Sequence, residues 1–187
     1  NLTTVVLPEG LQRIEADAFS FSALSSVTLP STLQYIGAGA FYGCRLEQLA
    51  LPAGLTEIGE DAFSWCKLTS IVFADRGGKD IPLGAACFAG NYRLYECILP
   101  EGITALPANM LAGDAEGVVD LPAIRIPASV TSLGSLAFNY CNNVTIFFMG
   151  PPLAVGESGM TSVPDRLGNA LVVYQGAHQA AWGGVLD

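Results

Sequence analysis

The side chains best suited to chemistry are five cysteines and a single histidine, His178. The number of cysteines is odd, and no two of them form the Cys-x-x-Cys pair that is typical of zinc and redox sites. A chain of 187 residues is also long enough to fold without disulfide bonds. We therefore predict buried, reduced thiols that act as small apolar side chains, at Cys44, Cys66, Cys87, Cys97 and Cys141.

Neighbouring carboxylates are the second candidate, because paired acids can act as general acid and base. Glu15 and Asp17, and further on Glu60 and Asp61, recur at similar positions but lack the Asp-x-Asp-x-Asp-Gly spacing of a calcium loop. We interpret them as part of a solvated face. His178 has no Ser, Cys or Asp partner at the spacing of a catalytic triad. The sequence thus predicts no catalytic, cofactor-binding or metal-binding residues, and no enzyme.

Composition narrows the choice of partner. Apolar residues make up 51% of the chain, which is enough for a sizeable core, and the formal net charge is −9. Such an acidic chain lacks the basic surface that binds nucleic acid. Its apolar runs, such as 71–74 and 144–149, are far shorter than the roughly 20 residues of a membrane span. We expect a monomer that does not insert into membranes, with any secretory signal absent from this sequence, which starts at Asn1.

The elements that position these residues follow from an internal repeat. Its first half reads Leu-x-x-Val-x-Leu-Pro and occurs with a spacing of 22 residues at Leu2, Leu24 and Leu46. The spacing then widens through two insertions, Asp75 to Ile81 and Gly113 to Asp120. Later copies start at Leu68, Leu94 and Leu121, and a degenerate seventh reads Val144-x-x-Phe147-x-Met149. Alternating apolar positions followed by proline favour a short strand, so each copy contributes one strand to a parallel sheet.

The second half of the repeat is equally regular and reads Leu33-x-x-Ile36-Gly37-x-x-Ala40-Phe41-x-x-Cys44 in a complete copy. We expect an extended piece at Leu-x-x-Ile-Gly, followed by a short helical turn at Ala-Phe. Stacked copies would bring equivalent aromatic residues into one buried spine. The spine is predicted to contain Phe19, Phe41, Phe63, Phe88, Leu111 and Phe138.

This unit resembles the BspA-type leucine-rich repeats of bacterial surface proteins over residues 1–150. The resemblance implies a secreted or cell-surface protein of gut or oral bacteria that adheres to host matrix proteins, other cells or a surface layer, and it implies no catalytic residues. The run from Ala170 to Trp182 also resembles the segment that ends arrays of this family.

The predicted fold is a β-dominated, α/β-type repeat solenoid: a right-handed leucine-rich repeat array with parallel strands, short helical turns and a C-terminal cap. Six full repeats and the degenerate seventh strand occupy residues 1–150, and the cap occupies residues 151–187. Within the cap, Leu171 to Tyr174 has the composition of a final parallel strand, and Ala177 to Trp182 that of a short helix.

Solenoids usually bind through exposed positions of the sheet, because the ladder holds those positions rigid. Small neutral residues fill these positions in the early copies, whereas the later copies carry aromatic and charged ones. We predict a partner-binding site at Tyr95, Glu96, Ile98, Arg125 and Phe148. The partner would be a protein, such as a host matrix or bacterial envelope component, or a glycan. The alternative is a structural stalk or spacer that displays another domain.

Overall fold

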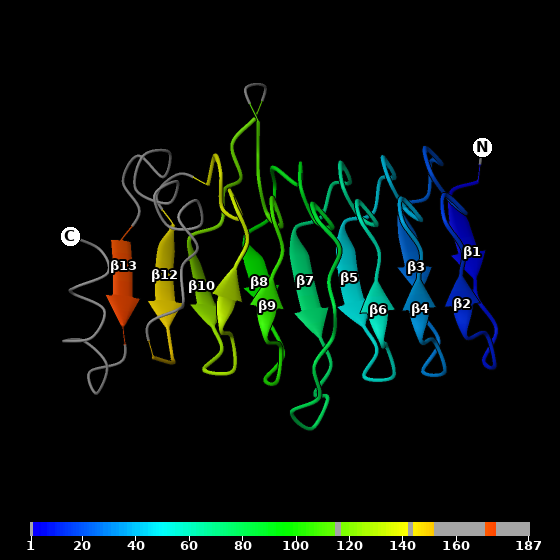
Figure 1. Cartoon of the computed structure of the whole chain (residues 1–187). Coiled ribbons are helices and arrows are strands. Elements are labelled where there is room, and N and C mark those ends of the chain that lie inside the picture. Colours follow the sequence, from blue (N-terminus) through cyan, green and yellow to red (C-terminus); the bar gives the residue numbers. More distant parts are fainter. Residues whose placement is uncertain (1, 115–116, 142–143, 152–170, 175–187) are drawn as a thin grey trace.

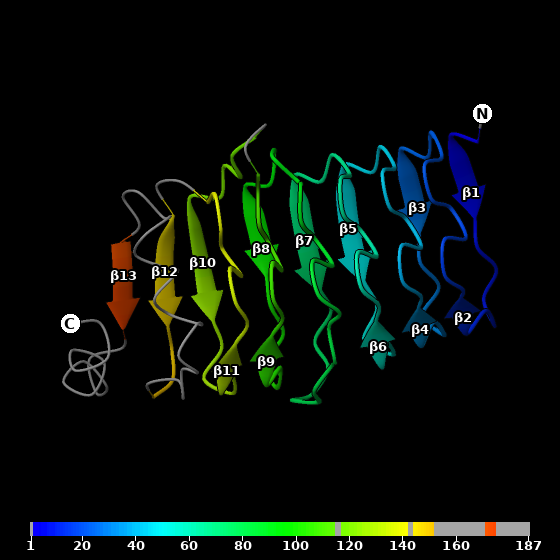
Figure 2. The same ribbon diagram turned by 45° about the horizontal axis from the view of Figure 1, so that its top comes forward.

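The computed structural model describes residues 2–114, 117–141, 144–151 and 171–174. Consecutive repeats stack side by side as the coils of a solenoid, and β1 and β13 lie at its two ends (Figure 1). Each coil passes through two rows of parallel strands, which face opposite sides of the molecule (Figure 2). The architecture predicted from the repeat, a parallel-strand solenoid, is confirmed.

The row of longer strands forms what we call the sheet face. It is divided into three hydrogen-bonded groups: β1 with β3, then β5, β7 and β8, then β10, β12 and β13. The bounds are β1 (Thr4–Val6), β3 (Ser26–Thr28), β5 (Gln48–Leu51), β7 (Ser70–Phe73), β8 (Glu96–Ile98), β10 (Ala123–Ile126), β12 (Thr145–Phe148) and β13 (Leu171–Tyr174).

The opposite row consists of two-residue strands from the second half of the repeat, except in the fourth coil, where Leu83 forms only an isolated bridge with Ile58. Strands β2, β4 and β6 form one ladder, and β9 and β11 form another. Their bounds are β2 (Arg13–Ile14), β4 (Tyr35–Ile36), β6 (Glu57–Ile58), β9 (Ala105–Leu106) and β11 (Ser132–Leu133). In both rows every second side chain points into the core between them, as the burial of Leu49, Leu51 and Ile58 illustrates.

The predicted aromatic spine is confirmed. Phe41 stacks on Phe19 with ring centroids 5.2 Å apart and on Phe63 with centroids 5.0 Å apart, and Phe63 stacks on Phe88 at 5.8 Å. Leu111 and Phe138 continue the spine as buried side chains. One side chain per coil thus links neighbouring repeats through the middle of the core, where each aromatic ring contributes more than its buried area alone.

The predicted short helical turns are wrong, because none of the described residues is helical. In an α-helix every N–H donates four residues back. Here every second N–H donates instead to the next coil, and the N–H groups between them donate three residues back. In the first coil, the N–H groups of Asp17, Phe19 and Phe21 donate to the carbonyls of Ala38, Ala40 and Tyr42.

Left-handed backbone conformations keep this turn segment from becoming a helix. Asp17 has a φ of 55° and Phe21 has a φ of 54°, and the same two positions are left-handed in most other coils. A helix needs negative φ at every residue. Because φ changes sign at these recurring positions, every second peptide group points toward the neighbouring coil. The N–H groups of one coil then bond to the carbonyls of the next, which forms a ladder of turns.

The glycine of the Ile-Gly pair is required by the close approach of neighbouring coils. A Cβ atom on Gly59 would lie 2.5 Å from the backbone nitrogen of Ala38 in the preceding coil. No larger residue fits there without a backbone shift. The same close approach explains the glycine at Gly37, Gly84 and Gly134, whereas the first and fifth copies have Glu15 and Pro107 at this position.

The degenerate seventh copy lies in a different register from the one predicted. Ile124 pairs with Ile146 and Ile126 pairs with Phe148, so the spacing from the sixth copy is 22 residues and not 23. A shift of one residue exchanges the two faces of a strand. Phe148, predicted to be exposed, is therefore buried at 2% exposure, and Phe147 occupies the outward position beside Arg125.

The predicted final strand is confirmed, because β13 pairs in parallel with β12 from Thr145 to Phe148. The structure does not show the predicted cap. The helix expected at 177–182, the Pro-rich segment before β13 and His178 lie outside the described residues.

Candidate binding surface

A hollow of about 550 Å³ opens on the sheet face between β8 and β10. The two strands are neighbours but belong to different hydrogen-bonded groups, so the ladder is interrupted here. The interruption coincides with the widest spacing between copies, which includes the insertion 113–120. The hollow therefore arises where the repeat is least regular.

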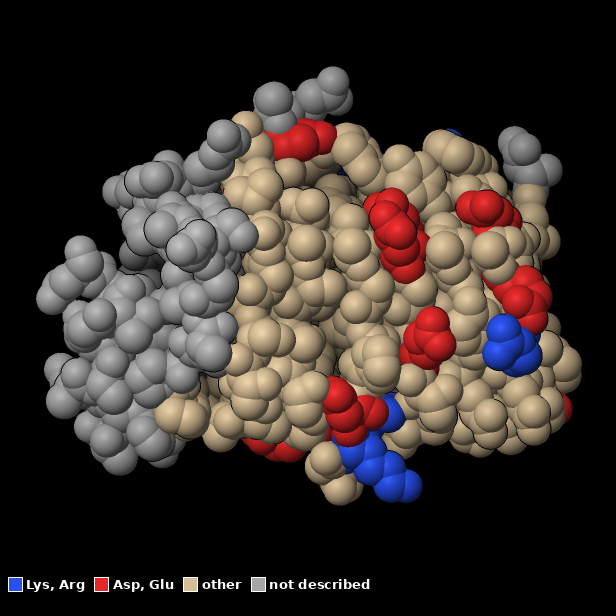
Figure 3. Space-filling view, viewed as in Figure 1, with Lys and Arg blue, Asp and Glu red and all other residues tan. Residues whose placement is uncertain are grey.

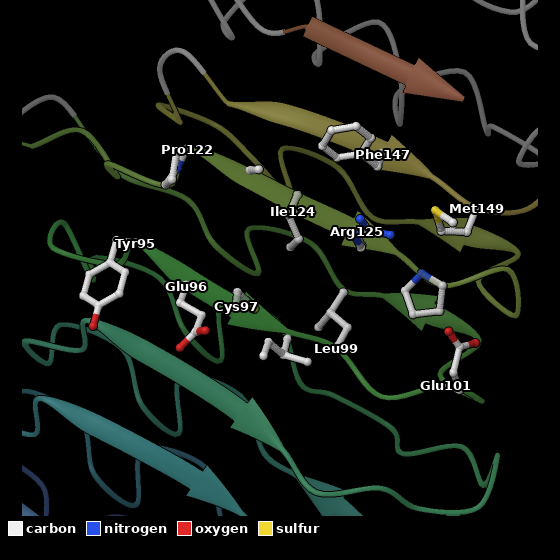
Figure 4. Close-up of a pocket in the computed structure, with 13 residues that line it drawn as sticks. Tyr95, Glu96, Cys97, Leu99, Glu101, Pro122, Ile124, Arg125, Phe147 and Met149 are labelled. Carbon is white, nitrogen blue, oxygen red and sulfur yellow. The ribbon is translucent and has the colours of Figure 1, made fainter. Parts of the chain in front are cut away.

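Apolar and aromatic side chains form most of the rim and floor of the hollow (Figure 4). Tyr95 is 56% exposed and Ile98 is 48% exposed, which is unusual for large apolar residues. Phe147 and Met149 line the opposite side from β12 and the residue after it. Such side chains can serve as anchors for a partner, because binding removes their apolar surface from water.

Arg125 supplies the positive charge of this surface and is the only Lys or Arg in the strands of the sheet face. Its guanidinium carbon lies 5.8 Å from the centroid of the Phe147 ring, which orients the side chain across the hollow. No residue in the described part of the chain forms an ion pair with it. An exposed guanidinium beside an aromatic ring is suited to bidentate binding of a carboxylate.

Two glutamates mark the ends of the hollow. Glu96 accepts a hydrogen bond of 2.5 Å from the hydroxyl of Ser70 on β7, which holds its carboxylate against the neighbouring strand. Glu101 lies beyond the end of β8, on the side of Met149 (Figure 4). The apolar centre is thus flanked by negative charge, with Arg125 between.

A second hollow of about 500 Å³ lies between β3 and β5, where the ladder is also interrupted. Its lining extends over β5 and β7 as far as Tyr95 and Glu96, which it shares with the first hollow, and is otherwise mostly small or neutral, as at Ser25, Ser26 and Ala50. Aromatic residues and arginine dominate binding energies at protein interfaces, whereas serine is under-represented. The hollow between β8 and β10 is therefore the stronger candidate.

The structure brings together most of the residues predicted from the sequence. Tyr95, Glu96, Ile98 and Arg125 line the same hollow, and Phe148 does not, because it lies in the core. Phe147 was missed by the sequence reasoning, although continuing the 22-residue spacing from β10 would have identified it. Glu101 was missed because it follows its strand, and Met149 was missed because the predicted register assigned it to the inward leucine position.

The cysteines are buried as predicted, and none of them forms a disulfide in the structure. The thiol of Cys44 donates to the carbonyl of Phe19 at 3.1 Å, and that of Cys66 donates to the carbonyl of Phe41 at 3.2 Å. Asn91 occupies the same repeat position and donates to the carbonyl of Phe63 at 3.0 Å. The position therefore serves to satisfy a carbonyl of the preceding coil.

Burial also makes these thiols poor nucleophiles. Desolvation raises the pKa of Cys66, of Cys97 and of Cys141 to about 12 in each case, and raises the pKa of Cys87 further. The thiolate is the reactive form of cysteine. The thiols are consequently protonated at neutral pH and act as apolar side chains with one weak donor.

The carboxylates considered for acid and base chemistry lie on the opposite side of the molecule, over β2, β4 and β6 (Figure 3). Glu15 and Asp17 are exposed, and Glu15 forms an ion pair of 2.9 Å with Arg13. Within the described ranges, no three His, Cys, Asp or Glu residues are grouped closely enough to hold a metal ion. The arrangement is that of a solvated face.

Comparison with known proteins identifies a family of repeat proteins and solved structures of similar fold. The family model described as BspA type leucine rich repeat region matches residues 12–145 with six copies. A leucine rich cell surface protein from Faecalibacterium prausnitzii A2-165 has the same fold, with a TM-score of 0.60 and 20% sequence identity. The alignment covers 100% of this chain and 63% of that protein, so this chain spans less than two thirds of its length.

No curated protein matches the chain. The part of the chain that the structure describes contains no helix that is long and apolar enough to cross a membrane.

Proposed function

The chain belongs to the family of BspA-type leucine-rich repeat proteins, and from this premise we propose that it is a non-enzymatic adhesion module of a bacterial cell surface. It binds a protein partner through the hollow between β8 and β10. The cell-surface description of the structurally similar protein supports this location.

The observation that carries the proposal is the combination of exposed anchors with an unpaired cation on a rigid face. Tyr95 and Ile98 expose apolar surface that folding leaves unburied, and Arg125 lies beside them without an ionic partner among the described residues. Backbone pairing to β7 and β12 fixes the two sides of the hollow. Little conformational entropy is then lost on binding, which favours affinity.

The lining also indicates what the partner presents. An apolar or aromatic side chain fills the centre of the hollow, and a carboxylate next to it pairs with Arg125. Glu96 and Glu101 repel further acidic groups at the ends of the hollow. The expected epitope is thus a short segment with one acidic residue beside a large apolar one, and basic residues at its flanks.

Binding to purified extracellular-matrix proteins and bacterial envelope fractions tests the proposal. The immobilised parent is compared with the double variant Tyr95→Ser, Ile98→Ser, and with Val6→Ser as a matched control. Val6 is 91% exposed on the same face but lies two groups of strands away. We expect the double variant to lose about tenfold or more in affinity, and the control to bind like the parent.

Equal binding by the parent and the double variant would contradict the proposal. Failure of the parent to bind any component would favour the alternative function, a stalk that displays another domain. The outward residues Thr4, Ser26 and Thr28 of β1 and β3 are small and offer no anchors for a partner, as expected of a stalk.

A further inference from the structure

Three cations stand in line on consecutive coils, away from the sheet-face hollow. Arg45, Lys67 and Arg93 each directly precede the leucine that begins the strand repeat. Gln48 pairs with Ser70 and Ser70 pairs with Glu96, so the three cations share one position of the register. Neighbouring coils in such a ladder are about 4.8 Å apart. We call this line the basic row; it follows the rim from which β5, β7 and β8 begin (Figure 1).

The basic row has no acidic counterpart. All three side chains are exposed, and the only ion pair among the described residues joins Arg13 and Glu15 on the other side. Acidic residues that could pair with these cations are plentiful, because the chain has 17 acidic residues and only 8 basic ones. Like charges at facing positions of adjacent strands destabilise a sheet. The row is thus a line of like charges without an ion-pair partner among the described residues.

Two aromatic side chains lie within the basic row. Trp65 and Tyr92 pack edge to face with ring centroids 5.8 Å apart. Together with Lys67 and Arg93 they line a hollow of about 380 Å³. Gly90 forms part of its floor, and a Cβ atom there would lie 3.0 Å from the Trp65 ring. The hollow thus combines stacking surface and positive charge in one place.

The backbone at Trp65 has the left-handed conformation that recurs at this position of the turn ladder in most coils. Its φ is 57°, in the left-handed region that glycine adopts freely, and its side chain is still 42% exposed. The equivalent residues of the coils on either side are Gly43 and Gly90. Holding a large residue in this conformation costs of order 1 kcal/mol or more. The turn ladder sets this conformation, and a large, exposed ring occupies it here where both adjacent coils have glycine.

An exposed aromatic residue with a left-handed backbone also occurs at the N-terminal end of the row. Phe21 has a φ of 54°, is 77% exposed and packs edge to face with Tyr42, with ring centroids 5.2 Å apart. It lies over Gly43, where a Cβ atom would be 2.9 Å from its ring. An exposed aromatic ring packed against a half-buried tyrosine thus occurs twice along the row, at Phe21 with Tyr42 and at Trp65 with Tyr92, as an elongated ligand would need.

We propose that the rim formed by Arg45, Lys67 and Arg93 with Trp65 and Tyr92 binds an anionic polysaccharide. A pyranose ring is similar in length to the coil spacing of about 4.8 Å, so successive sugar units lie on successive coils. The apolar faces of the sugar rings stack on the exposed aromatics, and their sulfate or carboxylate groups pair with the cations.

The observations favour a glycan over other polyanions. An acidic peptide places its carboxylates on flexible side chains and does not need flat aromatic surfaces. A nucleic acid is bound through a broad basic surface, which a chain of net charge −9 does not offer outside this narrow row. This second site is independent of the protein-binding hollow between β8 and β10, and either one can fail without the other.

Titration calorimetry of the full chain with dextran sulfate, and with uncharged dextran as a control, tests this proposal. We expect saturable binding of dextran sulfate that weakens as salt is added, and weak or no binding of dextran. The double variant Arg45→Gln, Lys67→Gln should bind roughly tenfold to thirtyfold more weakly. The double variant Arg13→Gln, Lys79→Gln removes the same charge elsewhere and should retain the parent affinity.

Trp65→Gly separates recognition of the sugar from attraction by charge. Glycine tolerates the left-handed backbone, so this variant should fold, and circular dichroism verifies that it does. We expect it to bind dextran sulfate several-fold more weakly at unchanged net charge. Equal losses in the two charge doubles, or tighter binding of poly-glutamate or single-stranded DNA than of dextran sulfate, would overturn the proposal.

Discussion

Removal of one ring from the aromatic spine should show how strongly the coils depend on one another. In Phe63→Ala a fully buried side chain is truncated between Phe41 and Phe88, whose rings are stacked on it at 5.0 Å and 5.8 Å. Truncation of a buried phenylalanine costs roughly 3–5 kcal/mol, of which about 0.5–1.5 kcal/mol per stacked pair exceeds the buried area.

Urea denaturation followed by circular dichroism measures this cost. With a slope of about 2 kcal/mol per molar urea, the midpoint should fall by roughly 1.5–2.5 M. Phe63→Leu, which copies the natural Leu111, keeps most of the volume but removes both stacked pairs, so it should lose about 1–3 kcal/mol, less than Phe63→Ala. Phe19→Ala, at the partly buried end of the spine, should lose less than Phe63→Ala. A midpoint of Phe63→Ala within error of the parent would refute the spine as a stabilising element.

Three further predictions concern other repeat positions. Gly59→Ala should lower the free energy of unfolding by several kcal/mol, because its Cβ would lie 2.5 Å from the backbone of Ala38; an unchanged melting temperature would show that the coils are farther apart. Native thiol titration at pH 8 should find almost no reactive cysteine, since burial raises the pKa of Cys66 to about 12; rapid reaction of several thiols would contradict this burial. Burial raises the pKa of Asp80, but the hydrogen bonds from Thr104 and Ile81 outweigh it and leave the pKa below its ordinary value, so Asp80 stabilises the fold above about pH 4 and loses this effect as the pH falls through its folded pKa. The stability difference between parent and Asp80→Asn should therefore shrink on acidification, and a difference constant from pH 7 to pH 2 would exclude the effect.

The repeat itself could be predicted from the sequence because each position has a simple physical cause. Leucine and isoleucine at alternate positions predicted the strands, and phenylalanine at a fixed spacing predicted the spine. The turn ladder could not be predicted in this way. Ala-Phe with small polar neighbours is compatible with a helical turn, and only the hydrogen bonds to the next coil decide against it.

The insertions show a second limit of the repeat pattern. The predicted insertion 75–81 departs from the repeat, yet it is anchored by Arg76, which is 8% exposed and donates to the carbonyls of Ala53, Lys79 and Asp80. Asp80 in turn accepts hydrogen bonds from the backbone and the hydroxyl of Thr104. These contacts join segments with no shared repeat position, so periodicity carries no information about them.

The residues of the candidate site could be predicted wherever the sequence pattern gave the correct strand register. Tyr95, Glu96, Ile98 and Arg125 lie where the outward positions of the strands place them, and they line one hollow. Phe148 was misplaced by a single residue, because its copy is degenerate and Phe147, Phe148 and Met149 are all apolar. The wide spacing and the insertion 113–120 mark this place in the sequence, but the repeat pattern does not show that the ladder between β8 and β10 is interrupted there.

A peptide selection tests most directly whether the sheet-face hollow is a binding site. A random peptide library is selected on the immobilised chain, with the folded double variant Tyr95→Ser, Ile98→Ser as the counter-selection. We predict enrichment of peptides with an acidic residue beside a large apolar one, whose affinity falls about tenfold or more for Arg125→Gln but not for Arg13→Gln. Peptides that bind the parent and the double variant equally well, or no enrichment on the parent, would contradict the claim that this hollow binds a protein.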